Sequence, residues 1–268
     1  SSMLTRFGPS SVVAWHRAAA VARPLSARSS LWKKNPSFAP VEGGKRFLST
    51  PQATEGSTTL VISKMTIDEW AEAFKKATID LAKMDIHGIS YLESAKRMRE
   101  LLKTGLLRHT DLNNNPERFF LAHRLLARHA PQLGPGFWIR FTVHYNLCAG
   151  TVLGLGNEEQ VKLLDEWQEQ GMLGCFSLTE KLAGVNSGLV VNTRADWDAA
   201  SQTFTLDSPD LGAYKNWISQ GLVADKTVAV ADLFIKGKSY GPHAFMMNLR
   251  EDRKPVPGVI LEDMGKKT

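Results

Sequence analysis

The side chains best suited to chemistry in this 268-residue sequence form none of the common catalytic patterns. Its seven histidines have no metal-ligand spacing, and its two cysteines, Cys148 and Cys175, have neither a CxxC arrangement nor a companion histidine cluster. The glycine-rich stretch from Gly150 to Gly156 lacks the Gly-Lys-Ser/Thr ending of a phosphate-binding loop and follows a helix-like segment. No GxSxG turn is present. Hydrolase and metalloenzyme chemistry therefore find no support, no metal is expected, and the two cysteines are expected to be buried free thiols.

The most informative segment runs from Gly174 to Gly188 with the sequence GCFSLTEKLAGVNSG. A strand-like run meets a Thr-Glu pair there and then a turn rich in Gly, Asn and Ser. A second segment, Lys215-Asn-Trp217-Ile218-Ser219, comes later in the chain. Further short motifs follow in this order: Tyr240-Gly-Pro-His243-Ala-Phe245, Leu249-Arg250, Pro257-Gly258 and Asp263-Met264-Gly265-Lys266.

Taken in this order, the motifs resemble the flavin-contacting segments of acyl-CoA dehydrogenases and acyl-CoA oxidases, and the later ones resemble the oxidases in particular. The resemblance covers roughly residues 133 to 268; before that, only the helical character agrees. It implies an α+β fold in which an N-terminal all-helical domain precedes a middle β-barrel-like domain. Each motif is weak alone, and their shared order carries the resemblance.

The resemblance also implies FAD as the cofactor. A flavin's pyrimidine edge presents alternating donors and acceptors that main-chain groups and one hydroxyl can match. Main-chain groups of Phe176 and Leu178 and the hydroxyl of Thr179 are expected at that edge. Trp217 is expected to pack against the ring, and Ser219 is expected near its reactive N5 side. Taken singly, the two hydroxyl residues could instead cap strands, and the tryptophan could be a core aromatic.

The turn of the first motif departs from the family pattern. Gly184 and Val185 lie where the family brings main chain close to FAD or to the acyl thioester. Lys181 and Leu182, however, replace the usual small or Pro/Gly residues, and Val185 stands where Ser is common. This departure leaves hydrogen bonding to the substrate in doubt.

In the family, a glutamate removes the α proton of a fatty acyl-CoA while hydride leaves the β carbon for the flavin, giving a trans-2-enoyl-CoA in fatty acid β-oxidation. That glutamate belongs to a C-terminal helical domain. The resemblance therefore reads this chain as an N-terminal portion with an incomplete β domain, inactive alone, and it assigns no catalytic residue. The implied substrate is a fatty acyl-CoA, and the full-length protein is expected to be a homodimer or homotetramer. Acyl chain length and the electron acceptor, oxygen or an electron-transferring flavoprotein, stay open.

A second hypothesis is a non-catalytic scaffold or assembly subunit of the same fold in mitochondria, supported by the altered turn. A nucleic-acid binder is a third, suggested by the net charge of +6 and the pI near 9.3. It is disfavoured because no basic and aromatic residues interleave outside the N-terminus.

The positive charge gathers at the N-terminus, where no Asp or Glu precedes Glu42. Scattered Arg and Lys among Ser and Ala are typical of a mitochondrial transit peptide, and Arg46-Phe47-Leu48-Ser49-Thr50 resembles its processing site. Residues 1–58 are therefore expected to be a transit peptide and polar spacer, with a disordered basic arm as the alternative. The protein is expected in mitochondria, although family oxidases are commonly peroxisomal. No apolar stretch is long enough to span a membrane.

The elements that must position the motifs follow from residue spacing. Helices are expected over residues 59–173. Thr66 with Glu69 and Asn157 with Gln160 are capping boxes, and Gly171 ends the last helix. The residues expected on buried helix faces include Ile67, Trp70, Phe74, Leu81, Met84, Leu92, Ala95, Met98 and Leu102.

After residue 174 the spacing becomes that of strands. Alternating or β-branched runs predict strands at about 202–206, 227–235, 243–249 and 259–261. Residues 174–268 are therefore expected to form the β domain.

Overall fold

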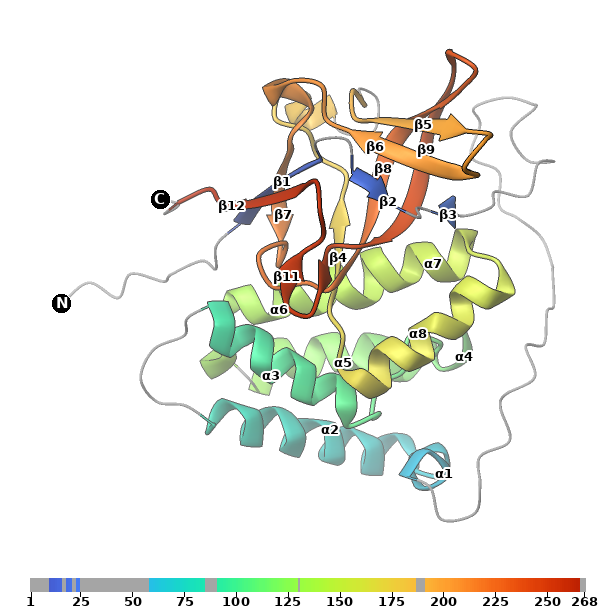
Figure 1. The fold of residues 1–268 in the computed structure, drawn as a ribbon. Coiled ribbons are helices and arrows are strands. Elements are labelled where there is room, and N and C mark those ends of the chain that lie inside the picture. The colour runs from blue at the N-terminus through green and yellow to red at the C-terminus, as the bar shows by residue number, and fades with distance from the viewer. Residues whose placement is uncertain are drawn as a thin grey trace.

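A computed structural model describes residues 10–15, 18–20, 23–24, 58–84, 91–129, 131–186 and 191–265. Figure 1 shows a layer of helices below a curled sheet, with β4 rising from the helices into the sheet. The predicted α+β fold is confirmed. The helices are α1 (Thr58–Ser63), α2 (Ile67–Ala82), α3 (Tyr91–Lys103), α4 (Asp111–Asn114), α5 (Pro116–His129), α6 (Pro135–Thr142), α7 (Gly150–Leu155) and α8 (Glu158–Gln170). Short 3-10 turns are η1 (Pro131–Leu133), η3 (Gly184–Asn186) and η4 (Leu211–Ala213), and η2 (Val143–Ala149) is a π-helix.

Local capping decides where two of the helices begin and end. Both predicted capping boxes are present, at the start of α2 and at the start of α8. In each box the cap side chain satisfies a main-chain N–H that the helix leaves unpaired, and the third residue returns a bond to the cap. Gly171 ends α8 in the left-handed conformation, with φ of 67°, which glycine adopts without steric cost.

The helical core forms around aromatic side chains whose polar atoms are satisfied by main chain. Trp70 and Phe74 are fully buried and stacked, with ring centroids 5.1 Å apart. The indole N–H of Trp70 donates to the carbonyl of Leu106 at 2.6 Å. Two predicted inward residues are wrong, because Leu92 is 59% exposed and Met84 is 51% exposed. Leu92 lies in the first turn of α3 at the edge of its apolar stripe, and Met84 lies beyond the end of α2 at Ala82.

One continuous helical segment is made of α6, η2 and α7. The π-helical turn in its middle changes the phase of the helix, and such turns are rare. The turn carries the buried residues His144, Tyr145 and Cys148. The hydroxyl of Tyr145 donates to the carbonyl of Leu107 at 2.9 Å, which ties this segment to the chain after α3.

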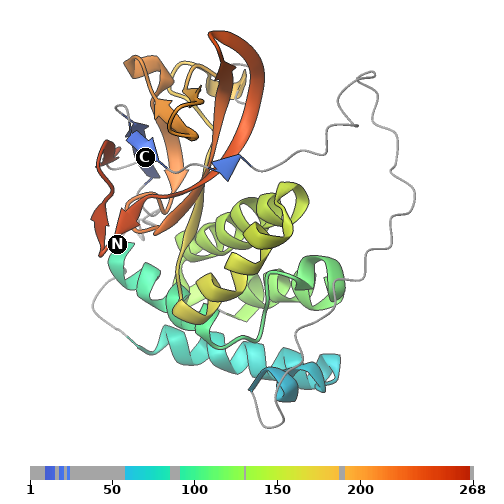
Figure 2. The same cartoon turned by 45° about the vertical axis from the view of Figure 1, so that its right-hand side comes forward.

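The sheet is built around the hairpin of β8 (Lys226–Ile235) and β9 (Lys238–Asn248), which curves through the upper part of the molecule (Figure 2). Its turn, Lys236-Gly237, has φ of 51° and 76°, as two-residue hairpin turns require. On the other edge of β8, β4 (Gly174–Ser177) pairs with residues 226–229 and β5 (Arg194–Asp198) pairs with residues 232–235, both parallel. The other strands are β6 (Thr203–Asp207), β7 (Lys215–Ser219), β10 (Arg250–Glu251), β11 (Lys254–Pro255) and β12 (Val259–Asp263). The four strands predicted from alternation are confirmed with shifted ends, and β5 was not predicted.

The predicted N-terminal transit peptide lies mostly outside the described residues. Three short strands within it are described: β1 (Ser10–Trp15), β2 (Ala18–Ala20) and β3 (Arg23–Pro24). β1 pairs with β12 and β7, β2 pairs with β6, and β3 pairs with β9. These pairings do not test whether the segment is a targeting peptide, which stays a prediction. Among the described helices, none has the length and apolar character needed to cross a membrane.

Candidate functional site

The two segments predicted to contact a flavin lie side by side. The N–H of Asn216 donates to the carbonyl of Thr179 at 2.8 Å, and the N–H of Lys181 donates to the carbonyl of Tyr214 at 2.9 Å. These two bonds make an antiparallel contact just beyond the end of β4 and at the start of β7. At the other end of β7, the side-chain amide of Gln220 donates to the carbonyl of Gly174 at 2.6 Å. β7 therefore runs back along β4.

The predicted ring-contacting residues lie on these two segments. Phe176 on β4 and Ser219 on β7 are half-buried, as is Thr179 just beyond β4. No hydrogen bond joins the hydroxyl of Thr179 or that of Ser219 to another described residue. Trp217 is 57% exposed, so it is not a core aromatic. Its main chain has φ of 59°, and its N–H donates to the sulfur of Met264 at 3.3 Å.

Leu178 has one main-chain group already engaged. Its carbonyl accepts a hydrogen bond from the side-chain ammonium of Lys215 at 3.1 Å. The carbonyl of Thr179 is likewise bonded, to the N–H of Asn216. Two consecutive carbonyls of the predicted flavin edge are therefore bonded within the protein, whereas the hydroxyl of Thr179 is not bonded to another described residue.

The two remaining predicted residues, Gly184 and Val185, lie apart from β4 and β7 in η3. Gly184 is exposed and left-handed, with φ of 51°. The altered turn before it is held down by Leu182, whose side chain closes over Gly212: an added Cβ at Gly212 would lie 2.5 Å from its Cδ1. Leu182 as a whole is nevertheless 79% exposed.

Sequence reasoning missed a buried ion pair between the two segments. The ammonium of Lys215 lies 2.8 Å from the carboxylate of Glu180, and both side chains are completely buried. Burial lowers the pKa of Lys215 to about 8, and the carboxylate of Glu180 partly offsets that effect. Both residues stand inside the recognised motifs, Glu180 directly after Thr179 and Lys215 at the start of the second segment. Nothing in the local spacing says that the two charges meet.

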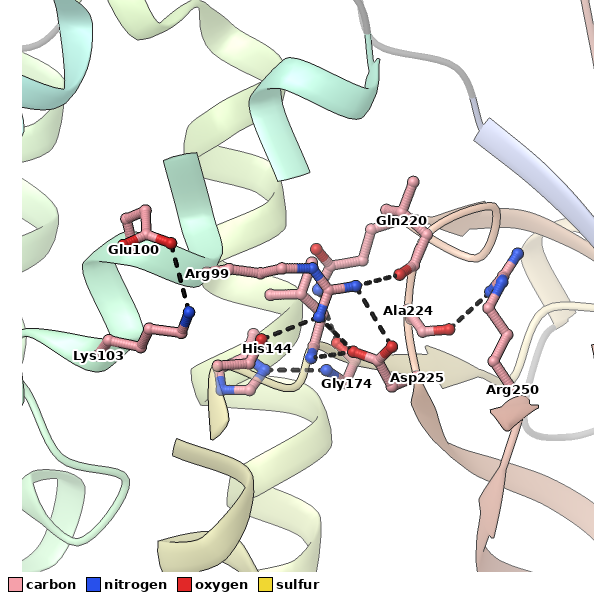
Figure 3. Close-up of polar contacts among 12 residues, drawn as sticks. Arg99, Glu100, Lys103, His144, Gly174, Gln220, Ala224, Asp225 and Arg250 are labelled. Atoms are coloured by element: carbon pink, nitrogen blue, oxygen red, sulfur yellow. Dashed lines mark hydrogen bonds and ion pairs between the residues drawn. The ribbon is translucent and has the colours of Figure 1, made fainter. Parts of the chain in front are cut away.

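The loop after β7 is anchored to the helical layer by Arg99 of α3 (Figure 3). One guanidinium nitrogen bonds the Asp225 carboxylate at 2.5 Å and the carbonyl of Gly171 at 2.9 Å; the other bonds the carbonyl of Val223 at 2.8 Å. The same carboxylate accepts from the N–H of Leu173 at 2.8 Å, just before β4. One carboxylate therefore joins α3, the start of β4 and the loop after β7.

Arg250 holds the same loop from the sheet. Its guanidinium donates to the carbonyls of Gly221, Leu222 and Ala224 at 3.0, 2.6 and 2.6 Å. Figure 3 shows Arg99 and Arg250 approaching the loop from opposite sides. Two arginines, each donating hydrogen bonds to main-chain carbonyls, fix the segment that follows Ser219.

The start of β4 is packed tightly against the π-helix. Nδ1 of His144 accepts a hydrogen bond from the N–H of Gly174 at 3.0 Å. Burial lowers the pKa of His144 to about 3. A Cβ at Gly174 would lie 2.5 Å from the sulfur of Cys148, so only glycine allows this approach. Cys148 and Cys175 are buried free thiols, as predicted.

Other kinds of site are scarce in the described residues. No group of three or more His, Cys, Asp or Glu side chains there could hold a metal ion. A surface hollow lined by Glu117, Phe120, Leu121 and Arg124 lies on α5 and contains none of the predicted site residues.

Comparison with known proteins gives the following relatives. No protein-family model matches the chain. It is 36% identical over 145 residues to an acyl-coenzyme A oxidase of Kluyveromyces lactis, an alignment that covers 50% of this chain and 19% of the relative. It is 34% identical over 165 residues to the acyl-coenzyme A oxidase of Saccharomyces cerevisiae, which covers 57% of this chain and 21% of the relative.

Solved structures show the same fold. Acyl-CoA oxidase 1 of Yarrowia lipolytica matches with a TM-score of 0.56 and 22% identity, over 78% of this chain and 33% of that one. Acyl-CoA oxidase-1 of Caenorhabditis elegans, solved in complex with FAD and ATP, matches with a TM-score of 0.54 and 23% identity over the same shares. The chain spans about a fifth of the length of the curated relatives. The chain is similar in sequence to acyl-CoA oxidases over about half its length and shares their fold over 78% of it.

Proposed function

We propose that this chain forms one side of an FAD site in a protein that, like the acyl-CoA oxidases it resembles, oxidises a fatty acyl-CoA to a trans-2-enoyl-CoA. The observation that carries the proposal is the antiparallel contact that lays Thr179 of the first motif beside Asn216, the residue before Trp217, of the second. Support also comes from two C. elegans oxidases of the same fold: one was solved with FAD and ATP, and one with FAD, ascaroside-CoA and ATP.

The residues present fit a flavin. The hydroxyls of Thr179 and Ser219 are unbonded within the described part of the chain, so each can bond a ring heteroatom. The exposed indole of Trp217 offers a flat apolar surface to an aromatic ring. When bound, FAD supplies the chemistry of accepting a hydride equivalent from the acyl chain.

Each residue has a proposed role. Main-chain groups of Phe176 and Leu178 and the hydroxyl of Thr179 bind the pyrimidine edge; for Leu178 this leaves the N–H, because its carbonyl is bonded to Lys215. Trp217 packs against the ring, and Ser219 orients its N5 side. Gly184 and Val185 bring main chain close to the cofactor or to the acyl thioester.

No carboxylate of this chain is assigned as the base that takes the α proton. Glu180 is the acidic residue nearest to the proposed site in sequence, but it is completely buried and bonded to Lys215, Asn192 and Thr193. A carboxylate with these partners has no access to a substrate proton.

We also propose that a transit peptide and spacer end at residue 58 and that the helical domain ends at residue 173. The full-length protein is proposed to be a homo-oligomer located in mitochondria, with peroxisomes as the alternative.

The test is an absorbance titration of the purified chain with FAD, followed by anaerobic octanoyl-CoA or palmitoyl-CoA. Binding would shift and sharpen the flavin band at about 450 nm, and in a protein that also contains the base, reduction by substrate would bleach it. In a protein that also contains the base, rapid recolouring in air would mark an oxidase and slow recolouring a dehydrogenase. If the chain leaves the spectrum of FAD unchanged, the proposal fails and the scaffold hypothesis gains.

A further inference from the structure

The sheet has a gap on one edge of β8. β4 covers residues up to Ala229, and β5 resumes opposite Asp232, so Val230 and Ala231 have no strand beside them on that edge. The chain leaves the sheet after Ser177 and returns at Thr193, whose carbonyl accepts from the N–H of Asp232 at 2.8 Å. A buried main-chain carbonyl left unpaired at such a gap costs free energy.

The side chain of Lys215 fills this gap. Its ammonium donates to the carbonyl of Val230 at 2.7 Å, to the carbonyl of Leu178 at 3.1 Å and to the carboxylate of Glu180 at 2.8 Å. An ammonium has three N–H donors, and here all three find acceptors. A lysine from β7 therefore takes the place that the main chain of a strand would occupy between β4 and β5.

Glu180 binds the main chain at the point where the loop returns to the sheet. Its two carboxylate oxygens accept from the N–H of Asn192 at 2.8 Å and from the N–H of Thr193 at 2.9 Å. The pair thus links Leu178, where the loop leaves the sheet, to Asn192 and Thr193, where it returns. It also links both to Val230 in the middle of β8.

These contacts lie beside the proposed flavin residues. Glu180 follows Thr179 directly, and Lys215 precedes Trp217 by two residues. A buried ion pair is seldom the most stable way to fill a core, because desolvation offsets much of the attraction. The completeness of its hydrogen bonding points instead to a role in fixing geometry.

We propose that Lys215 and Glu180 are positioning residues that hold the Thr179 segment and the Trp217–Ser219 segment at the separation that an isoalloxazine ring requires. The inference rests on the proposed function for its purpose. Its structural part, that the pair holds both ends of the loop to β7 and β8, is testable without any flavin.

The experiment compares Lys215→Met and Glu180→Gln with two controls in the purified chain. Asp196→Asn breaks the exposed pair with Arg194 on β5, whose side chains are 42% and 46% exposed. Leu126→Ala removes a buried side chain from the helical core. It is expected to lower Tm while leaving every residue of the sheet unchanged. Amide hydrogen exchange, the Kd for FAD and the visible circular dichroism of bound FAD are measured for each.

We expect Lys215→Met to speed exchange at Lys181, Asn192, Thr193 and Asn216 by at least about tenfold, because breaking a buried pair is costly, while the centres of β8 and β9 change little. The Kd for FAD should rise at least about tenfold, and the circular dichroism of bound FAD should change. Glu180→Gln keeps the shape and one acceptor oxygen, so a smaller change of the same pattern is expected; it carries the test if Lys215→Met does not fold.

The outcomes separate the two proposals. If the wild-type chain does not bind FAD but exchange rises at the four amides, the proposed function fails while the holding role stands. Exchange that rises evenly over the sheet would overturn the positioning role. So would an equal loss of FAD affinity in Leu126→Ala at the same loss of Tm.

Discussion

Nδ1 of His144 in the π-helix accepts the main-chain N–H of Gly174, the first residue of β4, at 3.0 Å. An accepting Nδ1 carries no proton, and burial holds the pKa of His144 at about 3. The contact between the helical layer and the root of β4 therefore depends on a neutral imidazole.

Stability is expected to fall in mild acid. In the unfolded chain His144 binds a proton near pH 6.5, whereas in the folded chain it does so only near pH 3, so its contribution is complete above pH 6.5 and is lost as the pH falls. Between pH 6.5 and 4.5 the loss from this residue is roughly 2–3 kcal/mol. Urea unfolding at pH 7.0, 5.5 and 4.5 measures it.

His144→Gln supplies the comparison, because it removes the titrating ring. Its free energy of unfolding should depend less on pH over this range, and the remaining dependence should include His109, whose pKa burial lowers to about 4. His129→Gln, at the end of α5, should retain the wild-type dependence. An unchanged slope in His144→Gln would contradict the assignment.

Loss of the shared carboxylate should loosen the junction between helices and sheet. Asp225→Asn removes the charge that joins Arg99 to the N–H of Leu173, and we expect a loss of about 1–2 kcal/mol, since the pair is partly exposed to solvent. Urea unfolding measures the loss of stability, and faster hydrogen exchange at the N–H of Leu173 shows that the structure loosens at this junction. Lys103→Gln breaks an exposed pair with Glu100 on the same helix and should change stability by less than about 0.5 kcal/mol. Equal losses of stability in the two variants would mean that the carboxylate of Asp225 stabilises the protein no more than an exposed ion pair does.

Gly174→Ala should destabilise the protein by steric conflict. The added Cβ would lie 2.5 Å from the sulfur of Cys148 and 3.2 Å from its Cβ, and overpacking of this kind costs about 1–3 kcal/mol. Cys148→Ala in the same chain removes the sulfur, so the double variant should recover part of that loss in a double-mutant cycle. Gly154→Ala on α7 meets nothing within 4 Å and should be neutral or stabilising. Additive losses at residues 174 and 148 would rule out the conflict.

Removing either free hydroxyl should weaken FAD binding without unfolding the chain. Thr179→Val and Ser219→Ala each delete one hydrogen-bonding group, and a loss of about 1 kcal/mol corresponds to a Kd about fivefold higher. Quenching of flavin fluorescence measures the Kd. Thr205→Val on β6 lies outside the two segments and should bind FAD as the wild type does. Wild-type affinity in both hydroxyl variants would place the flavin edge elsewhere.

Much of the fold could be predicted because it depends on neighbours in sequence. The capping boxes at Thr66 and Asn157 need only residues three positions apart, and Gly171 ends α8 through its own conformational freedom. Leu92 was misplaced because burial at the margin of an apolar stripe depends on which element packs over it, and Met84 because α2 ends at Ala82, before the spacing would have ended it. β5 was missed although its sequence, RADWD, alternates charged with apolar residues as a half-buried strand does.

The sequence by itself determined that a helical region precedes a region of strands and that two flavin-like motifs lie in the latter, since residue type and spacing encode both. Only the tertiary structure decided that Lys215 reaches Glu180 and the carbonyl of Val230 across the gap between β4 and β5. The same holds for Asp225, which Arg99 meets from 126 residues away in sequence. Such contacts form when strands and helices distant in the chain pack together, and desolvation then makes each buried charge find a partner. No local pattern records which partner that is.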